Sequence, residues 1–105
     1  MGVAYKKNID DYRESPALKI FQLLNNEKIK YSYYDPYVPE INSTYYNLKK
    51  KSLKSYKDNI SDYELVVILT DHDVIDYKLL QKKSRTIIDT RGIYRFRKFE
   101  NVLSL

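Results

Sequence analysis

Two cationic side chains lie in the loop that joins a short apolar run to the first predicted helix. Lys6 ends the run Val3–Tyr5, and Arg13 stands two residues before Ser15. Ser15 is a preferred helix N-cap and Pro16 suits the first helical position, so the pattern predicts a strand, a charged loop and a helix. Ligands of open α/β sheets bind at the carboxyl ends of strands. A lysine and an arginine at such a junction favour a site for an anion.

A third cation, Arg91, follows a predicted buried strand at Thr86–Asp89. Because the carboxyl ends of neighbouring parallel strands share one edge, Lys6 and Arg91 are predicted to point into the same crevice. The plainer alternatives are a solvated loop lysine at Lys6 and an ordinary surface charge at Arg91. Gly92 beside Arg91 suits a turn with positive φ or a close backbone approach.

Other polar clusters give weaker signals. His72 lies between Asp71 and Asp73 after an apolar run, and we expect it to be solvated while one of these aspartates caps the following helix. The run Lys49–Lys51 could touch nucleic acid through phosphates, but a solvated loop is the favoured interpretation. With two glycines in the chain, there is no glycine-rich phosphate loop.

Composition narrows the class of protein. At 105 residues, with 43% hydrophobic and 31% charged residues, the chain fits one globular domain. It has no cysteine and one histidine, which excludes disulfides, thiolate nucleophiles and clusters of Cys or His around a metal. Without an apolar run of about 20 residues or a signal-peptide pattern, we expect a cytoplasmic protein. The net charge of +5 suits an anionic partner, and on charge alone a small nucleic-acid binder is a further alternative.

Strands and helices are predicted to alternate. The predicted strands are Val3–Tyr5, Lys30–Tyr34, Ser52–Tyr56, Glu64–Thr70, Thr86–Asp89 and a last edge strand at Val102–Leu105. The predicted helices are Ser15–Asn26, Lys57–Tyr63 and Val74–Lys83, with a loop at 36–52 that includes one turn of helix near 45–51. This alternation predicts a Rossmann-like three-layer α/β sandwich with a mostly parallel sheet, whose first strand is truncated.

Four motifs follow one another along the chain. They are Tyr5-Lys6 with Asp11-Tyr12-Arg13-Glu14-Ser15-Pro16, then Asp35-Pro36-Tyr37-Val38-Pro39, then Ile68-Leu69-Thr70-Asp71-His72, and finally Ile87-Ile88-Asp89-Thr90-Arg91-Gly92. Together they resemble the C-terminal, UDP-binding domain of the UDP-glucose/GDP-mannose dehydrogenases. The resemblance is greatest to the branch that oxidises UDP-N-acetyl-hexosamines, and it covers roughly residues 2–94.

The resemblance implies roles for four residues. It implies that Lys6, Arg91 and the backbone near Tyr5 contact a UDP-sugar, and that Arg13 reaches NAD held by another domain of a complete enzyme. The alternative for Arg13 is an ion pair with an acidic residue of its own loop, with Asp11 holding it in place. No catalytic residue and no metal ligand is expected.

The resemblance also implies what residues 1–105 lack. The family's enzymes also contain an NAD-binding domain and a central dimerisation segment. They use a catalytic cysteine to oxidise the C6 alcohol of a UDP-sugar to a uronate, which serves polysaccharide biosynthesis. We therefore expect residues 1–105 to be one UDP-binding domain that is inactive alone. The alternatives are an interaction module that completes a dehydrogenase in trans with a separately encoded NAD-binding half, and a decayed-gene remnant. Because the first strand starts abruptly, marginal stability is expected.

Overall fold

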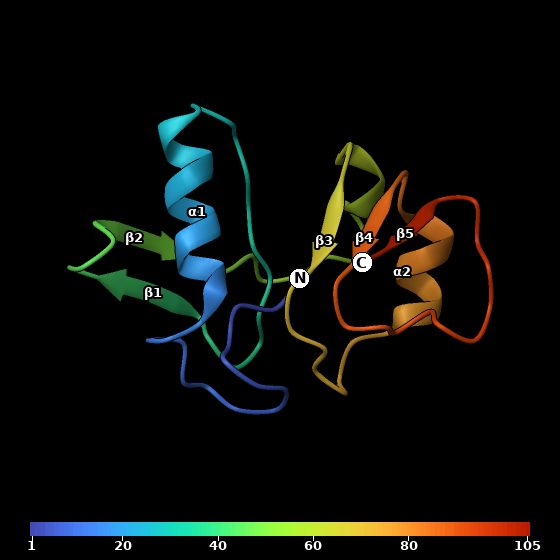
Figure 1. The fold of residues 1–105 in the computed structure, drawn as a ribbon, viewed down its shortest axis with the longest axis horizontal. Coiled ribbons are helices and arrows are strands. Elements are labelled where there is room, and N and C mark those ends of the chain that lie inside the picture. The colour runs from blue at the N-terminus through green and yellow to red at the C-terminus, as the bar shows by residue number, and fades with distance from the viewer.

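The computed structural model describes all of residues 1–105 and divides them into two halves that meet near the N-terminus (Figure 1). In the first half, helix α1 (Pro16–Asn26) begins as predicted, because the Ser15 hydroxyl accepts a hydrogen bond of 3.2 Å from the Ala17 N–H. The helix buries Ala17, Leu18 and Phe21 against the rest of this half.

A hairpin completes the first half. Strands β1 (Glu40–Ser43) and β2 (Leu48–Lys51) pair antiparallel, and Asn47 turns the chain between them with a φ of 53°. The prediction of loop and helical turn here was wrong. Only Ile41 and Leu48 are buried in these strands, so the sequence lacks the apolar alternation that identifies a half-buried strand.

The second half is a parallel sheet covered by a short helix. Strands β3 (Val66–Ile68), β4 (Ile87–Asp89) and β5 (Val102–Ser104) lie in that order, all parallel. Helix α2 (Tyr77–Lys83) and a 3₁₀ turn, η1 (Ile60–Asp62), lie close together beside them. The α/β class with a parallel sheet, the two buried strands and the last edge strand are thus confirmed.

Met1 extends this sheet by one residue. Its amino nitrogen donates to the Val67 carbonyl at 2.8 Å, and its own carbonyl accepts from the Leu69 N–H at 2.9 Å. On its other side the Gly2 N–H donates to the Tyr34 carbonyl at 2.9 Å. Met1 therefore sits as a strand-like link between β3 and the extended segment that ends at Tyr34.

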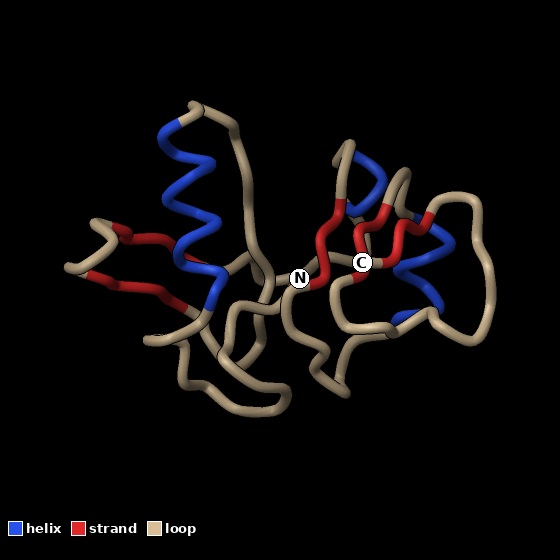
Figure 2. The backbone as a smooth tube through the Cα atoms, in the orientation of Figure 1, coloured by secondary structure: helices blue, strands red, loops and turns tan.

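The predicted strands Val3–Tyr5, Lys30–Tyr34 and Ser52–Tyr56 are not strands in the structure. Figure 2 shows these stretches as loop between the two halves. For the first of them the reason is specific. The N–H groups of Val3 and Ala4 donate to the Asp35 carboxylate, so they are not available for a ladder of sheet hydrogen bonds.

The apolar core divides in the same way as the fold. One cluster fills the first half: Val3, Ala4, Ala17, Leu18, Phe21, Tyr33, Val38, Ile41 and Leu48. The other fills the second half: Tyr56, Ile60, Val66, Ile68, Ile75, Leu80 and Ile87. Neither helix has the length and apolar character needed to cross a membrane.

Candidate functional site

The segment before Lys6 runs across the carboxyl end of β3. The Thr70 hydroxyl, two residues beyond that strand, donates to the Ala4 carbonyl at 2.6 Å. Gly2 lies against the same threonine, since a Cβ added there would stand 2.4 Å from the Thr70 carbonyl oxygen, and its φ is +79°. Only glycine fits at this crossing.

Asp35, from the second motif, fixes this segment through hydrogen bonds to its backbone. Its Oδ2 accepts from the N–H groups of Val3 and Ala4 at 2.8 and 3.1 Å, and its Oδ1 accepts from the Tyr37 N–H at 2.9 Å. The side chain is fully buried. A buried carboxylate that accepts several N–H groups in this way is well satisfied as an anion.

His72, from the third motif, is buried, so the prediction that it is solvated was wrong. Its Nε2 lies 2.8 Å from Asp35 Oδ2, and its Nδ1 accepts the Asn8 N–H at 2.7 Å. Because a backbone N–H can only donate, Nδ1 carries no proton, and the Nε2–H donates to Asp35. The helix cap expected from Asp71 or Asp73 is supplied instead by Asp76, whose Oδ1 accepts the Leu79 N–H at 3.0 Å.

Lys6 stands in the loop between these anchors. The chain turns at Asn8 with a φ of 63°, and the Tyr5 N–H donates to the Asp11 carbonyl at 2.8 Å, which closes the loop. The Lys6 side chain is exposed and makes no ion pair, whereas its neighbour Lys7 lies 3.9 Å from an Asp73 oxygen. Lys6 thus keeps its charge available to a ligand.

Arg91, from the fourth motif, is tied to the same end of β3. Its Nε donates to the Leu69 carbonyl at 2.7 Å, and the Thr90 hydroxyl donates to the Ile68 carbonyl at 2.6 Å. The buried Asp89 carboxylate accepts the Arg91 N–H at 3.0 Å, and Gly92 follows with the predicted positive φ, at 73°. The Arg91 loop and the segment before Lys6 therefore both touch residues 68–70, which places the two loops at one edge. The binding roles of Lys6, Arg91 and Tyr5 remain predictions.

Arg13 forms the local ion pair that was the alternative interpretation. Its Nε and Nη2 donate to the two Asp11 carboxylate oxygens at 3.1 and 3.2 Å, and these bonds lower the pKa of Asp11. The pair is exposed, so its electrostatic contribution to stability is small. The chain has two glycines, so it does not contain the glycine-rich turn of a dinucleotide-binding motif.

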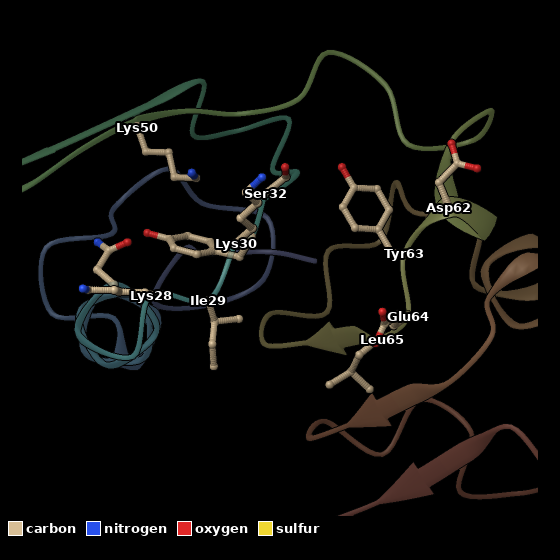
Figure 3. Close-up of a pocket in the computed structure, with 11 residues that line it drawn as sticks. Lys28, Ile29, Lys30, Ser32, Lys50, Asp62, Tyr63, Glu64 and Leu65 are labelled. Atoms are coloured by element: carbon tan, nitrogen blue, oxygen red, sulfur yellow. The ribbon is translucent and has the colours of Figure 1, made fainter.

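A cavity of about 960 Å³ lies near the amino end of β3, whereas the candidate site lies at the carboxyl end of that strand. Figure 3 shows it between a wall that carries Lys28, Lys30 and Lys50 and a wall that carries Tyr63 and Leu65. Residues 63–65 immediately precede β3, so this cavity lies at the amino end of the strand. None of the predicted site residues lines it, and the carboxyl edge remains the better candidate for a ligand.

The exposed cations and backbone groups at the carboxyl edge can hold an anionic ligand. Both ring nitrogens of His72 have partners inside the protein, Asn8 and Asp35. No group of three or more His, Cys, Asp or Glu side chains is arranged to hold a metal ion.

Comparisons with known proteins give a consistent result. Residues 1–96 match the model of the UDP binding domain of the UDP-glucose/GDP-mannose dehydrogenase family. A UDP-N-acetyl-D-mannosamine dehydrogenase of Methanococcus vannielii is 35% identical, over 88% of this chain and 22% of that protein. An NDP-N-acetyl-D-galactosaminuronic acid dehydrogenase of Ralstonia nicotianae is 33% identical, over 89% of this chain and 22% of that protein.

A solved structure agrees with these relatives. It is that of the UDP-N-acetyl-mannosamine dehydrogenase Cap5O from S. aureus, which superimposes with a TM-score of 0.65 at 33% identity. The match covers 98% of this chain and 23% of the other. The chain therefore spans less than a quarter of the length of the relatives that it matches.

Proposed function

Because the chain belongs to the UDP-glucose/GDP-mannose dehydrogenase family, as a UDP binding domain, we propose that it binds a UDP-sugar at the carboxyl edge of β3 and β4. In this proposal Lys6 and Arg91 contact the diphosphate, where the lysine acts as a point charge and the arginine as a fork of donors. The backbone near Tyr5 contacts the nucleotide. The chain binds and orients the ligand, and it makes or breaks no bond.

The observation that supports this proposal is the meeting of the two cationic loops at residues 68–70. The Ala4 carbonyl and the Arg91 guanidinium bond to Thr70 and Leu69, which are adjacent in the chain. Two positive charges on loops fixed to one strand end suit the two phosphates of a nucleoside diphosphate. A nucleic-acid binder has less support, because Lys49–Lys51 lies in the β1–β2 hairpin and not in either of the two cationic loops.

The test is an NMR titration of the labelled protein with UDP, and with AMP as control. We expect shifts near Tyr5, Lys6 and Arg91 with UDP and not with AMP. The variants Lys6→Ala and Arg91→Ala should each weaken UDP binding about tenfold, the usual value of one hydrogen bond to a charged group. Lys7→Ala is the matched control, since it removes a neighbouring charge that already faces Asp73. Equal shifts with both nucleotides would contradict the proposal.

The oxidation named for the relatives is proposed only for a complete enzyme. Arg13 lies on the exposed surface with its guanidinium held by Asp11, where it could face NAD bound to another domain. That domain could be part of a longer chain or a separately encoded half. The relatives' sugars also differ from one another, so the sugar of this chain is left open in the proposal.

A further inference from the structure

We infer that the buried Asp35–His72 pair positions the loop that carries Lys6, and so sets the geometry of the phosphate-binding edge. The inference rests on the proposed function, because positioning matters only if Lys6 binds a ligand. Neither residue contacts the ligand. Both act through the backbone of residues 3–8, and they are therefore positioning residues.

Asp35 fixes the chain before Lys6. One oxygen of its carboxylate accepts two consecutive N–H groups, those of Val3 and Ala4, which gives that stretch a single orientation. The Thr70 hydroxyl binds the Ala4 carbonyl on the opposite side of the same residue. Ala4 is thus held at both its N–H and its C=O, two residues before Lys6.

His72 fixes the chain after Lys6. Its Nδ1 accepts the Asn8 N–H at 2.7 Å, while the Asn8 side chain donates to Asp73 Oδ2 at 2.7 Å and accepts the Asp73 N–H at 2.9 Å. These three bonds hold Asn8 in its left-handed conformation, which asparagine tolerates better than most residues. Lys6 therefore lies midway between two anchored residues, Ala4 and Asn8.

The two anchors are one unit because His72 and Asp35 bond to each other. The Nε2–H donates to the same Asp35 oxygen that holds Val3 and Ala4, and Tyr37 packs over the imidazole with ring centroids 4.7 Å apart. A change at either residue should loosen both ends of the loop. Both side chains are wholly buried, so they can affect ligand binding only through the backbone of residues 3–8.

The first test needs no variant. The ¹⁵N shifts of the His72 imidazole in the labelled wild-type protein should show a neutral ring with the proton on Nε2, as the Asn8 N–H requires. A ring with its proton on Nδ1 would overturn the inference, because Asn8 would then have no acceptor.

The second test compares His72→Gln with Asp76→Ala in the UDP titration. His72→Gln removes the acceptor for Asn8 and should weaken UDP binding about tenfold, as expected when a contact to phosphate is misplaced. Asp76→Ala removes the cap of α2, away from the loop, and should leave UDP affinity unchanged where the protein is folded. Equal UDP affinity in His72→Gln and wild type would overturn the inference and leave the proposed function intact.

A separate readout keeps the two questions apart. If wild type shows no UDP-selective shifts, the proposed function fails, and the inference is judged on backbone order alone. The heteronuclear NOE of residues 5–10 should fall in His72→Gln and stay at the wild-type value in Asp76→Ala. Unchanged order of these residues in His72→Gln would overturn the inference.

Discussion

The two halves of the molecule satisfy their backbones in different ways. In the second half, β3 and β4 pair along a regular parallel ladder, and the strand interiors are apolar. In the first half β1 and β2 also pair, but Val3 and Ala4 form no ladder, and a buried carboxylate accepts their N–H groups instead. The candidate site lies where the halves meet, so its geometry depends on polar side chains more than on the sheet.

The parallel sheet and the Lys6 loop also differ in how many hydrogen bonds fix their backbones. A ladder fixes every residue of a strand through repeated bonds, whereas the Lys6 loop depends on a few bonds from Asp35, His72 and Thr70. Single substitutions can therefore alter the loop without dismantling the sheet. This is the arrangement in which a binding loop is adjusted on a stable scaffold.

The largest expected loss of stability comes from shortening one buried leucine in either apolar cluster. Leu18→Ala in the first cluster and Leu80→Ala in the second should each destabilise the protein by about 2–5 kcal/mol, because both side chains are almost completely buried. If the junction couples the halves into one cooperative unit, each variant should speed amide exchange in both clusters. Denaturant unfolding, with amide exchange read at Phe21 in the first half and Ile68 in the second, tests this. Faster exchange confined to the mutated half would show that the halves unfold separately.

A second prediction concerns a polypeptide of residues 1–105 with a free amino terminus, in which the Met1 amino group lies at the junction of the halves. Burial, partly opposed by Asp35, lowers the pKa of this group from 8.0 to about 6. Between pH 6 and 8 the unfolded chain therefore binds more protons than the folded one, so stability should rise with pH across this window. The gain is at most about 3 kcal/mol, at about 1.4 kcal/mol for each unit of pKa shift.

Urea unfolding of the protein with a free amino terminus, at pH 6, 7 and 8, measures this effect. The N-acetylated protein is the control, because it has no ammonium group and should lose this rise. A midpoint that falls from pH 6 to pH 8 in the unacetylated protein would contradict the prediction.

The smallest effects compare the two helix caps. Ser15→Ala at α1 and Asp76→Ala at α2 each remove a side chain that accepts a backbone N–H, and each should cost about 1 kcal/mol. Ser15→Thr and Asp76→Asn keep an acceptor and should lose much less. Thermal unfolding of the four variants makes the comparison. No loss in Ser15→Ala would mean that packing, and not the cap, determines where α1 begins.

Local patterns predicted the elements whose signals are short in sequence. Ser15 and Pro16 marked the start of α1, and the apolar run ending at Leu69 marked β3, because each signal lies within the element that it predicts. The β1–β2 hairpin was missed, since it buries only Ile41 and Leu48. The last strand was predicted from its apolar run, but its pairing partner could be read only from the structure.

For the candidate site the division is sharper. Residue types and their order along the chain predicted that the loops of Lys6 and Arg91 share an edge, and the two loops contact residues 69 and 70 in the structure. The binding roles of the two side chains stay predictions. The burial of His72 was decided only by the tertiary structure, because its partners Asp35 and Asn8 lie 37 and 64 residues away. From the sequence alone, a histidine flanked by two aspartates is expected to be exposed to solvent. Folding supplies the distant carboxylate and the backbone donor that make its burial favourable.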